Sequence, residues 1–112
     1  MLIRLRYWLQ KHIKMPFQRA VRGYCDYDLW NINCWFLDTM SKMLLRLSKE
    51  AVSYPGRGKY IEFEPWAKDL EKYGHMAKRL YDVDYDLRTD DYKNDLEEFL
   101  SWFKEYFKEL WD

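Results

Sequence analysis

The chain has 112 residues, of which 48% are hydrophobic, 20% aromatic and 34% charged. This length supplies one ordinary hydrophobic core, and the aromatic content excludes an intrinsically disordered chain. A formal net charge of zero argues against a general DNA-binding protein, which would be clearly basic. The composition predicts a single folded domain over residues 1–112.

The first segment alternates apolar and basic residues at helical spacing. This pattern predicts an amphipathic helix over residues 2–13. Pro16 interrupts the pattern, and because proline fits the first turn of a helix, a second short helix through Arg22 is expected. Gly23 then supplies a left-handed residue that ends it. The apolar stripe consists of Leu2, Leu5, Trp8, Leu9, His12 and Ile13.

A second helix is predicted from about Tyr27 to Lys49. Asp26 is expected to be its N-cap, because a carboxylate accepts the free amides of the first turn. Asp28 lies in that first turn, where the helix dipole favours an acid. The predicted core stripe is Leu29, Ile32, Phe36, Met40, Met43, Leu44 and Leu47.

A loop follows at residues 54–58, where Pro55 and Gly56 form a strong turn signal. A third helix is expected to begin near Pro65. Gly74 inside this helix costs about 1 kcal/mol relative to alanine, so we expect another element to pack closely there. Its apolar stripe is Trp66, Leu70, Tyr73, Ala77, Leu80 and Tyr81.

An acidic connector over residues 82–91 leads to a last helix, predicted from about Asp91 to Trp111. Its expected core face is Leu96, Phe99, Leu100, Phe103, Phe107 and Leu110, and its expected solvent face is Lys104, Glu105, Lys108 and Glu109. Three long helices and a broken N-terminal one, joined by short loops, predict an all-α fold. The predicted architecture is a small antiparallel helical bundle of about four helices.

Charge is unevenly distributed along the chain. Residues 1–25 carry six basic side chains and no acid, whereas residues 82–112 carry eleven acids against four basic side chains, a local charge of −7. One interpretation is that the two ends pack side by side, within one chain or across a dimer. The other is that the basic end binds phosphates or an acidic partner.

Metal-binding and catalytic patterns are not found in the sequence. Cys25 and Cys34 match neither a zinc spacing nor a CxxC motif, and His12 and His75 lie in no metal-binding spacing. The acidic run 82–86 lacks the glycine and the glutamate of a calcium loop. We therefore predict no metal, no cofactor and no enzymatic activity.

The N-terminal charges argue against a signal peptide, and no apolar run has the length of a membrane span. These features predict a cytoplasmic, reducing location without membrane binding.

The segment 22–31 joins the first two helices and is the main candidate site. A purely structural interpretation explains the glycine stop and the aspartate cap, with Arg22 bridging Asp26 or Asp28. The functional interpretation is that aromatic side chains stack on a base, the arginine binds phosphate and an acid or amide holds a ribose. The same residue types also make protein interfaces. The candidate ligand-binding residues are Arg22, Tyr24, Asp26, Asp28, Trp30 and Asn31.

The chain resembles a group of small bacteriophage and prophage proteins. The resemblance lies in the segment R-G-x-[SC]-D-x-D-x-W-[ND]-[LI]-[DN], here residues 22–33, in Tyr54-Pro55, in an aromatic helix near Trp66, and in a final Leu110-Trp111-Asp112. Cys25 and Asn33 stand where serine and aspartate are more usual in that group. The resemblance implies a phage accessory protein acting in the infected bacterial host.

Three functions are compatible with these features. The first is a non-catalytic binder that counteracts bacterial immunity by sequestering a nucleotide-type immune signal. The second is an inhibitor of a host defence protein, such as a CRISPR effector, in which the acidic C-terminal third imitates nucleic acid through Asp84, Asp86, Asp90 and Asp91. The third is a virion or assembly adaptor. A homodimer is also expected, because so aromatic a short chain leaves apolar surface over.

Overall fold

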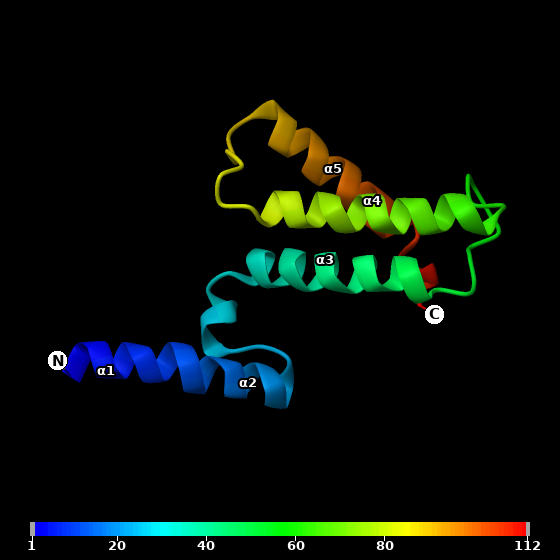
Figure 1. Ribbon diagram of the computed structural model, residues 1–112. Coiled ribbons are helices and arrows are strands. Elements are labelled where there is room, and N and C mark those ends of the chain that lie inside the picture. The colour runs from blue at the N-terminus through cyan, green and yellow to red at the C-terminus, as the bar shows by residue number, and fades with distance from the viewer. Residues whose placement is uncertain (1, 112) are drawn as a thin grey trace. The chain divides into compact units, whose positions relative to one another are not determined.

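The computed structural model describes residues 2–111 and divides the chain into two compact units, Met1–Phe36 and Leu37–Asp112 (Figure 1). Within residues 2–111 the regular structure is helical, with no β-strand. The predicted all-α class and small helical bundle are therefore confirmed. The single domain expected from the chain length stays a prediction.

The N-terminal unit begins with a continuous helix rather than the broken one that Pro16 suggested. It consists of α1 (Leu2–Leu9), a π-helical turn η1 (Gln10–Lys14) and α2 (Met15–Arg22). Proline has no N–H and its ring collides with the carbonyl four residues earlier. The wider π turn, in which the Met15 N–H donates to the Gln10 carbonyl, accommodates the ring without a break. Gly23 ends the helix at φ 84°, as predicted.

The start of the second helix was predicted wrongly. Residues Asp26–Leu29 form a separate 3-10 turn, η2, and α3 (Ile32–Glu50) begins only afterwards. Cys25, not Asp26, is the N-cap of η2, and the Asp28 carboxylate accepts the Cys25 N–H at 2.8 Å. Because that contact closes η2 as a turn of its own, the helix does not run on from Tyr27.

The C-terminal unit contains the rest of α3 together with α4 (Phe63–Tyr81), α5 (Asp90–Glu105) and the 3-10 turn η3 (Phe107–Glu109). Figure 1 shows α3 and α4 running in opposite directions, with α5 returning obliquely along α4. A Cβ on Gly74 would lie 2.8 Å from Cγ of Leu45, so α3 and α4 pack closely at this glycine. The close packing expected at Gly74 is confirmed.

Aromatic side chains fill the core of the C-terminal unit. Trp66, Tyr60 and Phe99 are fully buried, and the rings of Tyr73 and Trp102 stack at 4.3 Å. Tyr60 lies in the segment between α3 and α4 and contacts the rings of Trp66 and Tyr106. This segment therefore contributes to the core, although its sequence signals only a loop.

Two predicted helix faces are rotated relative to the observed ones. On α5 and the residue after it, the buried side chains are Tyr92, Phe99, Trp102 and Tyr106, whereas Leu100 and Phe107 are exposed. On α3, Leu37, Ser41 and Leu44 are buried, whereas Ile32 and Met43 are exposed. Tyr81, expected in the third stripe, is also exposed, as is Leu29. Apolar side chains occupy two overlapping faces of α5, so either face could be buried. The face with Trp102 is the buried one, because Trp102 donates a hydrogen bond to the buried Tyr60.

Polar contacts join the loop to α4, α5 and the chain beyond α5. The Tyr60 hydroxyl donates to Asp69 at 2.5 Å and accepts the Trp102 indole N–H at 2.8 Å. Arg57 donates to Glu105 and Glu109, two residues of the predicted solvent face. These contacts hold the loop over the aromatic core.

Candidate functional site

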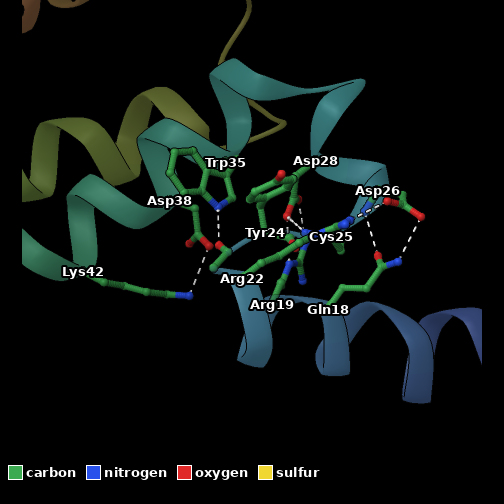
Figure 2. Close-up of polar contacts among 11 residues, drawn as sticks. Gln18, Arg19, Arg22, Tyr24, Cys25, Asp26, Asp28, Trp35, Asp38 and Lys42 are labelled. Atoms are coloured by element: carbon green, nitrogen blue, oxygen red, sulfur yellow. Dashed lines mark hydrogen bonds and ion pairs between the residues drawn. The ribbon is translucent and has the colours of Figure 1, made fainter.

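The corner between α2 and α3 is held by reciprocal hydrogen bonds (Figure 2). The Gln18 side-chain amide donates to Asp26 Oδ2 at 2.9 Å, and its carbonyl oxygen accepts the Asp26 backbone N–H at 2.8 Å. Trp35 donates its indole N–H to the Gly23 carbonyl at 3.0 Å. The left-handed Gly23 turns the chain back, and the Gln18–Asp26 pair fixes η2 against the side of α2.

Asp28 is buried at the centre of this corner. Arg19 binds it with both ends of its guanidinium, from Nε at 3.1 Å and from Nη2 at 2.8 Å. The Arg19 hydrogen bond is the main cause that lowers the pKa of Asp28 to about 2, and the Cys25 N–H adds to it. Asp28 is thus a structural anion, and its arginine partner is Arg19 rather than Arg22. Spacing did not identify Arg19, because the partner lies nine residues away across the turn.

Arg22 closes the outer side of the corner. It donates from Nε to the Tyr24 carbonyl at 3.0 Å and from Nη2 to Asp26, and its guanidinium lies 4.5 Å from the centre of the Tyr24 ring. The pKa of Asp26 is lowered, first by the Gln18 amide and then by Arg22. Arg22, Tyr24 and Asp26 therefore form one cluster. The Arg22 guanidinium and the Asp26 carboxylate are already engaged in hydrogen bonds within this corner.

The other candidate residues lie apart from this cluster. Trp30 is 85% exposed, and Asn31 is half-buried, with its carbonyl accepting the Trp35 N–H. A small hollow of about 170 Å³ is lined by Tyr24, Asp28, Leu29, Ile32 and Trp35. The structure does not gather the six candidate residues into one pocket.

A larger hollow lies in the same unit, on a face of the N-terminal helix that the sequence analysis did not single out. It measures about 550 Å³ and is called the helix-face hollow below. Its lining residues are Ile3, Arg6, Tyr7, Gln10, Lys11, Met15 and Tyr27. The first six recur at intervals of three or four residues and so share one side of the helix. Tyr27 comes from η2, beside the Asp26 that Gln18 holds.

The cations of the N-terminal unit fall into two groups. Residues 2–36 carry six basic side chains against Asp26 and Asp28, a net charge of +4 (6 − 2). Lys14, Arg19 and Arg22 pair with these two acids. Among residues 2–111, Arg4, Arg6 and Lys11 have no acidic partner. Two of these three, Arg6 and Lys11, line the helix-face hollow.

Other features outside this unit carry less chemistry. No group of three or more His, Cys, Asp or Glu side chains in residues 2–111 is arranged to hold a metal ion. Asp82 Oδ1 accepts the Asp84 N–H, and Asp86 Oδ1 accepts the Arg88 N–H. These two acids of the connector therefore stabilise backbone turns. None of the helices in the described part of the chain combines the length and the apolar character required to cross a membrane.

Comparison with known proteins returned no match: no family model, no curated protein and no solved structure shows significant similarity to this chain. The chemistry of the candidate site therefore rests on its own side chains. These are two unpaired cations, one amide and two tyrosine rings around one hollow.

Proposed function

We propose that this protein is a non-catalytic binding protein whose N-terminal unit takes up a nucleotide-type ligand. The observation that carries the proposal is the helix-face hollow, where Arg6 and Lys11 stand without acidic partners beside Tyr7 and Tyr27. Tyr27 is 57% exposed, so its ring is accessible to a ligand.

The lining residues match the parts of a nucleotide. Guanidinium and ammonium groups bind phosphate oxygens, and an exposed tyrosine ring stacks on a base of any sequence. The Gln10 amide both donates and accepts, which suits a ribose hydroxyl or a base edge. A volume of about 550 Å³ lies within the range of about 300–1,000 Å³ typical of small-molecule sites.

The corner residues support this site rather than form it. Arg22 would have to give up Asp26 in order to bind a phosphate, and the buried Asp28 is already neutralised by Arg19. Their role in the proposal is to hold η2, and with it Tyr27, against the helix. The ligand contacts first expected at Arg22 and Trp30 are accordingly assigned to Arg6, Lys11 and Tyr27.

Sequestration is the biological role that we propose for this binding. The resemblance to phage accessory proteins suggests action in the cytoplasm of an infected bacterium, where holding a nucleotide immune signal would counteract the host defence. The proposal includes no catalytic step, because binding alone lowers the free concentration of the signal.

A thermal-shift screen against linear and cyclic nucleotides tests the function. A ligand that binds only the folded state stabilises it by about 2.7 kcal/mol at one hundred times its Kd. We expect a concentration-dependent rise in Tm with at least one nucleotide, with recovery of the unmodified compound afterwards. No shift with any nucleotide would contradict the proposal, and conversion of the compound would contradict its non-catalytic part.

A second function is favoured by one observation in the C-terminal unit. Asp84, Asp90 and Asp91 are exposed and, within residues 2–111, have no cationic partner. An exposed row of carboxylates suits a basic groove on a defence protein. If the protein is such an inhibitor, Asp90→Lys with Asp91→Lys will weaken inhibition, whereas Lys93→Ala will not; equal inhibition by both variants excludes this mechanism.

A further inference from the structure

The helix-face hollow contains recognition groups in pairs. Arg6 and Lys11 are five residues apart, which separates their backbones by about 7 Å along the helix axis at 1.5 Å per residue. Tyr7 extends from the same helix, whereas Tyr27 extends from η2. The hollow thus has two cations and two aromatic rings, the rings contributed by different elements.

We infer that the helix-face hollow binds a dinucleotide-class ligand, with two phosphate groups and two bases. This inference rests on the proposed function and narrows it to one class of nucleotide. Arg6 and Lys11 each engage one phosphate, and Tyr7 and Tyr27 each stack on one base. A mononucleotide has a single base, so it leaves one tyrosine ring without a partner.

The electrostatics of the N-terminal unit agree with an anionic ligand that carries two phosphate groups. Its net charge of +4 attracts anions, and both of its acids are already paired with Lys14, Arg19 or Arg22. The hollow therefore offers one unpaired cation for each of two phosphate groups.

The position of Tyr27 is what distinguishes this hollow from a simple basic helix face. Gln18 binds both the carboxylate and the N–H of Asp26, so the residue next to Tyr27 is held at two points. Because the backbone beside Tyr27 is held in advance, only the side-chain torsions of Tyr27 are left to be ordered when a base stacks on its ring.

The test uses the full chain and three commercial probes, the dinucleotide pApA, ADP and AMP, measured by isothermal titration calorimetry. We expect pApA to bind at least about fivefold more tightly than ADP, since about fivefold is the lower end of what one stacked base contributes to affinity. The ADP comparison keeps two phosphate groups and removes one base. AMP removes one phosphate as well.

Variants then locate the site. Arg6→Ala and Lys11→Ala should each weaken pApA binding roughly tenfold, since each loses a charge-assisted hydrogen bond. Arg4→Ala is the matched control, because it removes the same charge from the same helix outside the hollow, and its affinity should stay within about twofold. Tyr27→Ala should weaken pApA binding while leaving the affinity for AMP nearly unchanged, whereas Tyr27→Phe keeps the ring and the affinity. Circular dichroism confirms that each variant is folded.

The possible outcomes separate this inference from the proposed function. If ADP or AMP binds as tightly as pApA, or if Arg6→Ala and Lys11→Ala bind pApA as the unmodified chain does, the dinucleotide site is wrong and nucleotide binding stands. If none of the three probes binds, the inference is overturned, and the broader nucleotide screen decides the function separately.

Discussion

Asp28 shows at the residue scale how one buried carboxylate holds a turn. It accepts two hydrogen bonds from Arg19 and one from the Cys25 N–H, and it has little exposed surface. Asp26, two residues earlier, makes comparable contacts but is far more exposed. Burial, rather than the number of contacts, therefore makes Asp28 the more important of the two acids.

Replacing Asp28 with alanine should open the corner. Removing one partner of a buried charged hydrogen bond costs roughly 2–3 kcal/mol, because the remaining groups lose their compensation. We expect the amides of residues 23–31 to exchange with solvent much faster in Asp28→Ala, measured by hydrogen–deuterium exchange. Asp26→Ala is the matched control and should have a smaller effect; equal effects would show that burial is not decisive.

The same carboxylate makes the corner sensitive to acid. Hydrogen bonding by Arg19 lowers the pKa of Asp28 to about 2, whereas an unfolded aspartate has a pKa of about 3.9. Since the folded pKa is the lower one, the stabilisation is fully present above pH of about 4 and is lost as the pH falls to about 2. Exchange of the corner amides measured from pH 5 to 2 should show this loss. Asp28→Asn should remove this part of the pH dependence, and an unchanged profile would refute the assignment.

Gly74 illustrates a close helix contact. An added Cβ would lie 2.8 Å from Leu45 Cγ and 3.1 Å from the Leu45 backbone nitrogen. Alanine normally stabilises a helix by about 1 kcal/mol over glycine. At this position the collision should outweigh the higher helix propensity of alanine. Gly74→Ala should therefore lower the free energy of unfolding by roughly 1–3 kcal/mol in urea denaturation. In a chain that already carries Leu45→Ala the penalty should shrink, and a full penalty in that background would contradict this explanation.

At the scale of elements, the π turn η1 adjusts the N-terminal helix to Pro16. Pro16→Ala restores an N–H and removes the ring that collides with the preceding turn. We expect residues 10–14 to become α-helical, which chemical shifts and amide protection measured by NMR would reveal. Phe17→Ala, a neighbouring exposed position with an N–H, should leave η1 intact. Persistence of the π turn in Pro16→Ala would mean that another contact holds it.

The hydroxyl group of Tyr60 joins the loop between α3 and α4 to both α4 and α5. Tyr60 donates to Asp69 on α4 and accepts from Trp102 on α5. Tyr60→Phe leaves both partners without this hydrogen bond in a buried place, which should cost roughly 1–3 kcal/mol of stability in urea denaturation. Tyr54→Phe, at an exposed tyrosine of the same loop, should change stability by less than about 0.5 kcal/mol. Equal stabilities of the two variants would exclude a structural role for the Tyr60 hydroxyl.

At the scale of the whole molecule, the net charge of zero is the sum of opposite charges on the two units. Residues 1–36 carry +4 and residues 37–112 carry −4 (13 − 17). The overall charge therefore does not determine whether the basic unit binds a small anion. Local charge, rather than the sum, determines which ligand is attracted.

Salt should consequently weaken ligand binding without unfolding the protein. The screening length falls from about 10 Å at 0.1 M to about 3 Å at 1 M salt, and the cations of the hollow are exposed. We expect the Kd for pApA to rise severalfold over this range, as measured by calorimetry. The Tm of the ligand-free protein, recorded under the same conditions, is the control. A Kd that is independent of salt would contradict phosphate recognition by Arg6 and Lys11.

Several elements could be predicted from local signals alone. Gly23 ends its helix because glycine adopts a left-handed conformation at little cost, and Pro55 and Gly56 mark a loop for similar backbone reasons. The start of the third helix was predicted near Pro65, within two residues of the observed Phe63, because proline fits the first turn of a helix. The choice of Asp26 as N-cap failed because residues 26–29 form a separate 3-10 turn capped by Cys25, whose N–H donates to the Asp28 carboxylate.

The sequence by itself determined that this protein is all-α, where its main helices lie and which loops separate them, because helical periodicity and turn residues act over a few neighbouring positions. Only the tertiary structure decided which side of α5 is buried and that Tyr27 lies against the N-terminal helix. Those outcomes depend on contacts between distant residues, Tyr60 with Trp102 and Gln18 with Asp26. The pattern of hydrophobic or basic residues along a helix shows which side chains it can bury or use for binding. The elements that pack beside the helix determine which of these side chains are buried and which face a ligand.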